Sequence, residues 1–270
     1  MIEYFFAYLI SIVIGIIATV IGLGGGFLYV PTLSLIFGLD TKTAIGTSLA
    51  IMIFSSLSAS LWYRQQGVIL CRVAAVLIVP SMIATVFGSF LTTLVDARIL
   101  TLVFCIMLIM ISLEMLVPSF RFLTEIQAGP SFVLSTSVPS QGIQPVARIW
   151  YSHLVFWGFI GGLLSGVTGT SGGAIFMPAL ATAGIPVHYA VATSMFTIII
   201  VSLTGATAHA TLGQISLPFL VVYAAGAAFG ALVGAHIAPH VREGQIRKVF
   251  GVLLIGIAIL MFQQKVLVGF

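Results

Sequence analysis

The chain has 270 residues, of which 60% are hydrophobic and only 6% are charged, and its formal net charge is +4 at pH 7. With a mean hydropathy of +1.24, this composition excludes a water-soluble domain and indicates a multi-pass protein of the cell (inner) membrane. The small positive charge bears on loop orientation and does not indicate nucleic-acid binding.

Eight apolar stretches follow one another along the chain, and most have the length of about 20 residues that a membrane-spanning helix needs. They cover residues 4–38, 43–63, 73–91, 99–117, 149–184, 189–209, 215–238 and 249–263. The stretches 4–38 and 149–184 are too long for one crossing, yet about 52 Å of helix is too short for two crossings of a core about 30 Å thick. We expect each to form two short helices that meet at a break. The N-terminus has no basic region or clear cleavage site, which argues against a secretion signal.

The chain contains one pattern twice, because GLGGGFLYVPTL at residues 22–33 returns as GTSGGAIFMPAL at residues 169–180. Further equivalent positions keep nearly the same spacing: Gly15 and Gly162, Pro31 and Pro178, Thr47-Ser48 and Thr193-Ser194, Gly67 and Gly213, Gly88 and Gly234, Val103-Phe104 and Val249-Phe250. A repeat of roughly 100 residues in a membrane protein is typical of a transporter with two structural halves. We expect two transmembrane repeats, residues 1–117 and 149–270.

Lys and Arg residues are distributed unequally between equivalent loops. The loops 64–72 and 239–248 carry them, whereas their equivalents 210–215 and 92–98 have no excess of positive charge. Because Lys and Arg favour the cytoplasmic side, equivalent loops are predicted on opposite faces. The predicted fold is therefore an all-α, polytopic membrane protein with two inverted-topology repeats, five passes each and broken short helices at the glycine-rich motifs. Both termini are expected outside and a polar linker, residues 118–148, inside.

In both copies the glycines precede a proline, an order typical of a chain break followed by a helix start. The unpaired N–H groups of a helix start attract anions, and two inverted copies would direct two such ends at one central site. The alternative is that these glycines only allow close helix packing. A second repeated element, AIGTS at 44–48 and AVATS at 190–194, opens the next helix of each copy. Its hydroxyls either donate to an oxyanion or bond back to their own helix.

These two elements define the candidate site. The candidate substrate-binding residues are Gly24, Gly25, Gly26, Thr47, Ser48, Ser171, Gly172, Gly173, Thr193 and Ser194. The candidates for a substrate or proton path are Tyr63, Arg64, Thr197, Thr204 and His209. For His209 a plain interfacial role is the alternative. Cys71 and Cys105 lack metal-ligand spacing and are interpreted as packing residues.

The broken GxGGG segment, Pro31, the A-x-x-T-S helix start and the inverted second copy resemble the TauE/SafE family of sulfite and organosulfonate transporters. The resemblance covers about residues 8–262. It implies an exporter of small sulfur-containing anions that works by alternating access, with the glycine breaks and the TS pairs as anion contacts. It implies no cofactor, no metal and no catalytic residue. In the second copy Thr170 and Ser171 replace Leu23 and Gly24, so the two half-sites are expected to be unequal.

An anion channel and a membrane-embedded enzyme are the alternatives to a carrier. An anion channel would give passive flux without exchange of substrates. A membrane-embedded lipid pyrophosphate phosphatase would need clustered acidic residues, whereas the chain has only six Asp and Glu residues and none of them cluster. The expected partners are the transported anion and membrane lipids. The residues alone leave open the exact substrate, the direction of transport, a coupling ion and assembly into a homodimer.

Overall fold

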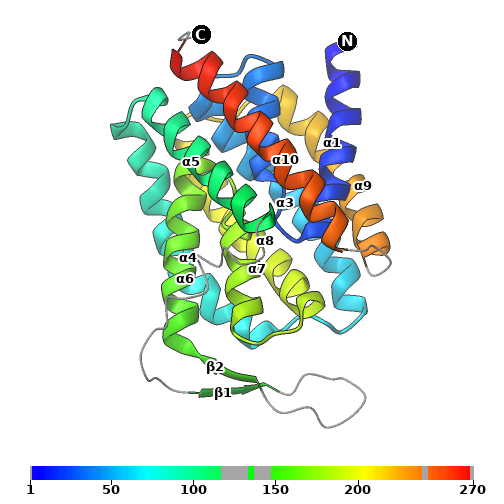
Figure 1. The fold of residues 1–270 in the computed structure, drawn as a ribbon. Coiled ribbons are helices and arrows are strands. Elements are labelled where there is room, and N and C mark those ends of the chain that lie inside the picture. The colour runs from blue at the N-terminus through cyan, green and yellow to red at the C-terminus, as the bar shows by residue number, and fades with distance from the viewer. Residues whose placement is uncertain (1, 117–132, 137–146, 239–242, 268–270) are drawn as a thin grey trace.

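The computed structural model describes residues 2–116, 133–136, 147–238 and 243–267, and most of them are helical (Figure 1). In chain order the elements are α1 (Ile2–Ile21), α2 (Gly26–Pro31), η1 (Thr32–Ile36), α3 (Thr41–Gln65), α4 (Cys71–Leu94), α5 (Ala97–Leu116), β1 (Val133–Thr136), β2 (Ala147–Trp150), α6 (Tyr151–Thr168), α7 (Gly173–Thr182), α8 (Val187–Thr211), α9 (Leu217–Ile237), α10 (Glu243–Met261) and η3 (Phe262–Leu267). Among the described helices, α1, α3, α4, α8 and α9 are long and apolar enough to cross a membrane.

The helical fold is confirmed apart from one small hairpin. Strands β1 and β2 pair antiparallel, with Val133 opposite Trp150, inside and just beyond the predicted linker. Most of the linker 118–148 lies outside the described residues, so its polarity and position stay predictions. The expected five passes per half also stay a prediction, because the α2 to η1 segment and α7 are too short to cross a membrane alone.

Both long apolar stretches divide at their glycine motifs, as the sequence predicts. Helix α1 ends at Ile21 and α2 begins at Gly26. Helix α6 ends at Thr168 and α7 begins at Gly173. The four-residue gaps between them hold glycines whose positive φ angles a continuous helix cannot contain.

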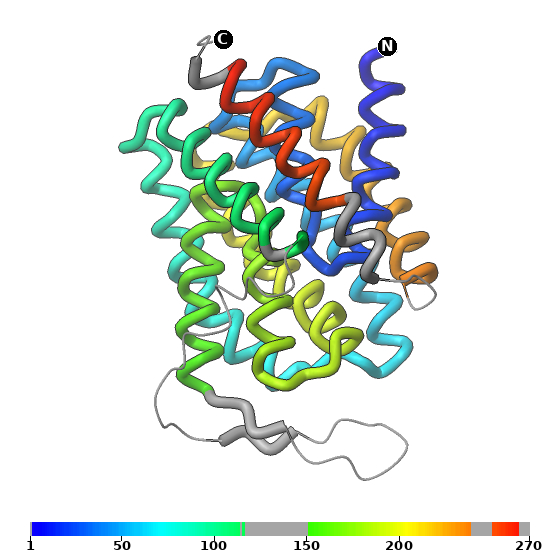
Figure 2. Tube along the Cα trace, viewed as in Figure 1, coloured from blue at the N-terminus to red at the C-terminus, as the bar shows by residue number. Residues whose placement is uncertain are grey.

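The helices pack in pairs that join the two parts of the sequence. Helix α1 lies along α9, and α4 lies along α6. Helix α3 packs against both α8 and α9, and α5 packs against α10. Figures 1 and 2 show both termini at one end of the molecule and the β hairpin at the other. Helix α1 therefore starts at the end that carries the termini, whereas α6 starts at the hairpin end.

Small residues let these helix pairs approach until their backbones touch. A Cβ atom added at Gly15 of α1 would lie 2.7 Å from the carbonyl oxygen of Ala227 in α9. A Cβ added at Gly162 of α6 would lie 2.6 Å from the Cα of Ser81 in α4. The Thr85 hydroxyl then donates to the Gly162 carbonyl oxygen at 2.9 Å. Close packing of this kind, with hydrogen bonds between helices, is typical of membrane proteins.

The outer surface of the bundle is apolar. Large apolar side chains are exposed on several helices, among them Phe87 (72% exposed), Val221 (68%) and Val252 (63%). In a water-soluble protein such a surface would promote aggregation, whereas lipid tails solvate it. The surface therefore agrees with the membrane assignment made from composition.

The two cysteines differ in their surroundings. Cys105 is buried, and its Sγ lies 3.5 Å from the Ala258 carbonyl oxygen of α10, which agrees with a packing role. Cys71 is exposed at the first position of α4. The packing interpretation is therefore wrong for Cys71, because hydropathy alone does not show which face of a helix start points outward.

Candidate functional site

The first break is built by three glycines in the left-handed region. Gly22, Gly24 and Gly25 have φ angles of 81°, 83° and 90°. Gly25 is the N-cap of α2, and its carbonyl oxygen accepts hydrogen bonds from the N–H groups of Leu28 and Tyr29. Residues with a Cβ atom rarely adopt such φ angles, so the glycines allow the chain to stop one helix and begin the next within four residues.

The second break repeats this geometry with one serine in place of a glycine. Gly169 and Gly172 have φ angles of 73° and 70°, and Gly172 is the N-cap of α7. Ser171 has a φ of 52° and, among the described residues, is the one non-glycine residue with a positive φ. Holding a non-glycine residue there costs roughly 1–3 kcal/mol and is typical of functional positions.

The two breaks belong to different halves of the sequence, but they lie against each other in the structure. A Cβ added at Gly26 would lie 2.6 Å from the Cα of Thr170 in the second break. A Cβ added at Gly173 would lie 2.7 Å from the backbone carbon of Leu23 in the first break. The first residues of α2 and α7 therefore each contact the other break, and only glycine fits at either position.

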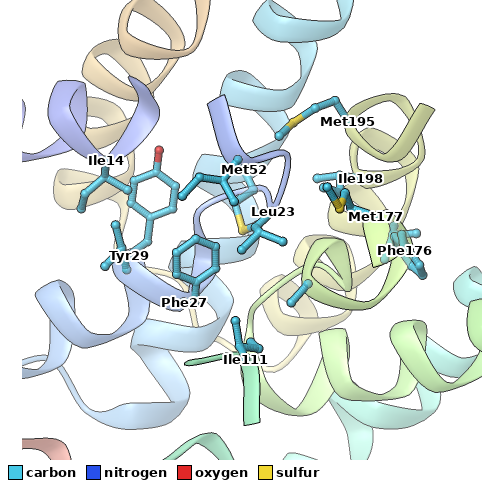
Figure 3. Packing of buried hydrophobic residues seen from close by; sticks show 14 of the residues in the cluster. Ile14, Leu23, Phe27, Tyr29, Met52, Ile111, Phe176, Met177, Met195 and Ile198 are labelled. Carbon is cyan, nitrogen blue, oxygen red and sulfur yellow. The ribbon is translucent and has the colours of Figure 1, made fainter. Parts of the chain in front are cut away.

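Apolar side chains enclose the two breaks (Figure 3). The labelled side chains around them include Leu23, Phe27, Met52, Phe176, Met177 and Ile198. Within the described residues whose burial is resolved, the buried polar side chains other than tyrosines are serines, threonines and His209, with no Lys, Arg, Asp or Glu. The region therefore offers hydroxyls and backbone dipoles but no fixed opposite charge.

The predicted serines of the TS pairs bind the opposite break. The Ser48 hydroxyl donates to the carbonyl oxygen of Gly169 at 2.9 Å. The Ser194 hydroxyl lies 3.4 Å from the carbonyl oxygen of Gly22, to which it donates. Each serine has a single hydroxyl hydrogen, so in this conformation that hydrogen already has an acceptor within the protein.

The predicted threonines bind the loop before a helix of the other half. The Oγ1 of Thr47 accepts from the N–H of Ser216 at 2.9 Å, and the Oγ1 of Thr193 accepts from the N–H of Leu70 at 3.1 Å. In both contacts the hydroxyl acts as the acceptor. Its own hydrogen has no acceptor among the described residues and stays available for another oxygen atom.

The path candidates on α8 bond back to their own helix. The Thr197 hydroxyl donates to the carbonyl oxygen of Thr193 at 2.9 Å, and the Thr204 hydroxyl donates to that of Ile200 at 2.8 Å. Thr197 is fully buried, whereas Thr204 is half-buried. In this conformation the hydrogens of both hydroxyls therefore have acceptors within α8.

The remaining path candidates lie far apart. The ring of Tyr63 is fully buried and packs 5.8 Å from the ring of His188, in the first turn of α8. His209 is fully buried in the last turn of the same helix, with Nε2 3.0 Å from the Gly166 carbonyl oxygen and Nδ1 2.7 Å from Oε1 of Gln214. Twenty-one residues of helix separate His188 from His209, or about 30 Å. Arg64, next to Tyr63, is exposed.

Residues 7–261 match the family described as sulfite exporter TauE/SafE. The chain belongs to the TauE/SafE family. It is accordingly a multi-pass membrane transporter and not an enzyme.

Curated relatives of this TauE/SafE transporter are named probable membrane transporter proteins, and the similarity covers most of each relative. The probable membrane transporter protein YunE of Bacillus subtilis is 29% identical over 263 residues, which cover 92% of this chain and 95% of the relative. The probable membrane transporter protein YdhB of the same organism is 29% identical over 229 residues, which cover 84% and 87%. A probable membrane transporter protein of Haemophilus influenzae is 24% identical, with coverage of 94% and 96%. No solved structure matches the chain.

Sequence reasoning missed the partners of the TS pairs in this TauE/SafE transporter. The backbone N–H groups of Leu70 and Ser216 were not among the candidates, although each directly precedes a helix, α4 or α9. The signal was present, because the two residues occupy equivalent positions in the repeat. Backbone groups carry no sequence signature of their own, so only the position in the repeat could have identified them.

Proposed function

We propose that this protein exports small sulfur-containing anions, such as sulfite or organosulfonates, by alternating access around a site formed by its two glycine breaks. The observation that carries the proposal is the mutual contact of the two helix starts, Gly26 against Thr170 and Gly173 against Leu23. A helix start presents unpaired N–H groups and the positive end of its dipole, which favour an anion. The family supports the substrate class, since its description is that of a sulfite exporter.

Inverted halves are part of this proposal, and paired contacts support them. The sequence repeat makes α1, α3, α4 and α5 equivalent to α6, α8, α9 and α10, so the α1 to α9 contact is the counterpart of the α6 to α4 contact. The Ser48 to Gly169 hydrogen bond likewise corresponds to the bond from Ser194 to Gly22. The opposite starting ends of α1 and α6 in Figure 1 agree with a two-fold relation in the membrane plane.

The groups proposed to bind the anion fall into two sets. The backbone at Gly24, Gly25, Gly26, Ser171, Gly172 and Gly173 supplies the positive helix ends. Thr47 and Thr193 supply hydroxyl hydrogens that have no acceptor among the described residues. Ser48 and Ser194 donate across the halves in this conformation and would reach the anion when the halves move, so they couple binding to the motion.

The ends of the transport path are proposed to lie at the two repeat-equivalent positions Tyr63 and His209. These residues mark the two ends of the α3 and α8 helix pair, and Arg64 adds an exposed positive charge beside Tyr63. Thr197 and Thr204 occupy α8 between the central site and His209. An arginine at a mouth raises the local concentration of anions without a buried charge.

Among the residues whose burial is resolved, no basic side chain is buried, and this favours an anion with a single negative charge. An anion bound by dipoles and hydroxyls is only partly neutralised, so a second negative charge at the same site adds a large desolvation cost. The proposal therefore favours a group that carries one negative charge, such as hydrogensulfite or a sulfonate, over sulfate.

Uptake into proteoliposomes tests this function. We expect labelled sulfite to enter vesicles that contain the purified protein faster than empty vesicles, with saturation, and we expect external methanesulfonate to compete. Sulfate and acetate serve as competitors of different charge and different chemistry, and sulfate should compete weakly. If folded protein gives no sulfite uptake above the empty vesicles, the sulfur-anion proposal is wrong.

The exposed Cys71 provides a test of the orientation. The predicted cytoplasmic loop 64–72 contains Cys71, so a membrane-impermeant maleimide should label it in inside-out vesicles and not in intact cells. Cys105 is buried and should not react in either preparation. A Cys71→Ser, Thr211→Cys variant moves the label to the exposed end of α8 in the equivalent loop and should react in intact cells only. The opposite pattern for both proteins would overturn the orientation.

A further inference from the structure

Two tyrosine hydroxyls lie in the interior without hydrogen-bond partners. Tyr29 of α2 and Tyr223 of α9 are both fully buried, and their rings meet edge to face with centroids 6.1 Å apart. Neither hydroxyl oxygen has a hydrogen-bond partner among the described residues. Ser55 lies beside the Tyr29 hydroxyl and Thr32 beside that of Tyr223, but the Ser55 hydroxyl donates to the Met52 carbonyl oxygen and the Thr32 hydroxyl donates to the Leu28 carbonyl oxygen. Because a buried hydroxyl favours a hydrogen-bond partner, these two phenols are available to bind a further polar group.

The tyrosine pair lies directly behind the first glycine break. A Cβ added at Gly25, the N-cap of α2, would lie 3.4 Å from the Cζ atom of Tyr29, which carries the hydroxyl. In Figure 3 the hydroxyl of Tyr29 points away from Phe27 and past Ile14. A molecule held at the first break therefore has a hydrogen-bonding group within a short distance on one side.

The second half has no such pair. Phe176 is the equivalent of Tyr29, and a Cβ added at Gly172 would lie 2.6 Å from its Cζ atom, so the ring packs on its break in the same way. Leu77 is the equivalent of Tyr223 and is also fully buried. The two half-sites thus share their shape, but a pair of phenol hydroxyls lies behind the first break where the second has Phe176 and Leu77.

From this difference we infer that Tyr29 and Tyr223 form a subsite for an uncharged oxygen at the far end of a short organosulfonate. A phenol both donates and accepts, which suits a hydroxyl group. Among the residues whose burial is resolved, no Lys, Arg, Asp or Glu is buried to match a charged end, so a second charge is disfavoured there. This inference rests on the proposed transport of sulfonates and narrows it to two-carbon sulfonates with a neutral oxygen, for which 2-hydroxyethanesulfonate is the probe.

Ligand binding to the purified full-length protein tests the subsite. Dissociation constants are measured for 2-hydroxyethanesulfonate and for ethanesulfonate, which lacks only the hydroxyl, with thermal unfolding of each protein without ligand. The wild type should bind the hydroxylated probe about tenfold more tightly, the gain expected from one or two hydrogen bonds. In Tyr29→Phe and Tyr223→Phe this ratio should fall to about one while ethanesulfonate binding is unchanged. Tyr4→Phe, whose hydroxyl-bearing ring is exposed and packs on Phe219, should keep the wild-type ratio.

The stability of the ligand-free variants separates a substrate subsite from a structural water site. Removing a hydroxyl that has no partner should leave Tm unchanged or raise it. A clear fall in Tm of both variants would mean that the phenols hold a structural water and would overturn the subsite, as would an unchanged ratio in Tyr29→Phe or equal binding of both probes by the wild type. If the wild type bound neither sulfonate nor sulfite, the proposed function itself would fail, which is a different result.

Discussion

Replacing Gly26 with alanine is expected to give a protein that folds poorly and transports little. The added methyl group would meet the Gly169 carbonyl oxygen and lie 2.6 Å from the Cα of Thr170, and both are backbone atoms that cannot rotate away. Overpacking of a buried site usually costs 1–3 kcal/mol, and a clash with backbone lies at or above about 3 kcal/mol. The loss is measured as a lower Tm and lower yield of folded protein in detergent, together with lower uptake of sulfite.

Gly256→Ala is the matched control for this variant. Gly256 also lies inside a helix, α10, but it is exposed and a Cβ added there would meet no atom within 4 Å. Alanine stabilises a helix interior by roughly 0.5–1 kcal/mol relative to glycine, so its Tm should be equal or higher. A Gly26→Ala protein with the Tm and uptake of the Gly256→Ala protein would show that the two breaks are not in contact.

The second large effect is expected from removing both hydroxyls of one TS pair. Thr193→Val with Ser194→Ala removes the acceptor for the Leu70 N–H, the donor to the Gly22 carbonyl oxygen and the proposed contacts to the anion. Hydrogen bonds of this kind contribute about 1 kcal/mol each, so sulfite uptake at limiting substrate should fall roughly ten- to one-hundredfold. The equivalent Thr47→Val with Ser48→Ala should have a similar effect if the halves act together.

Two further variants serve as controls for the loss of uptake in the double variant. Thr193→Ser keeps the hydroxyl and should restore most of the uptake, while Thr207→Val removes an exposed hydroxyl that bonds only within α8 and should change nothing. If the Thr193→Val, Ser194→Ala protein were folded and kept its wild-type rate and apparent affinity, the proposed hydroxyl contacts would be wrong.

The sequence predicted the breaks and the helix starts because both occur twice. The segments 22–26 and 169–173 are rich in glycine and each precedes a proline, and glycine is the residue that most readily adopts a positive φ. A single glycine cluster would have been compatible with simple helix packing. Because the glycine cluster occurs twice at equivalent positions, it predicts a helix break in each half more specifically than one cluster would.

The repeat does not predict which residues the candidate site residues contact. Ser48 and Gly169 are far apart in the sequence, and a repeat pairs equivalent positions without showing which positions touch. Tyr29 and Tyr223 escaped notice for the opposite reason, since their equivalents Phe176 and Leu77 are apolar and a search for repeated polar residues passes over them. The exposure of Cys71 also depends on which side of α4 faces its neighbours, and hydropathy does not encode this.

Counterflow in proteoliposomes tests the carrier most directly. Vesicles are loaded with unlabelled sulfite, with methanesulfonate or with buffer alone, and the entry of labelled sulfite is followed with the membrane potential held at zero. A carrier that alternates around one central site should take up label several times faster into vesicles loaded with a substrate, because the loaded anion returns the site to the outside. Equal entry into all vesicles, accompanied by an anion current, would contradict alternating access and indicate a channel.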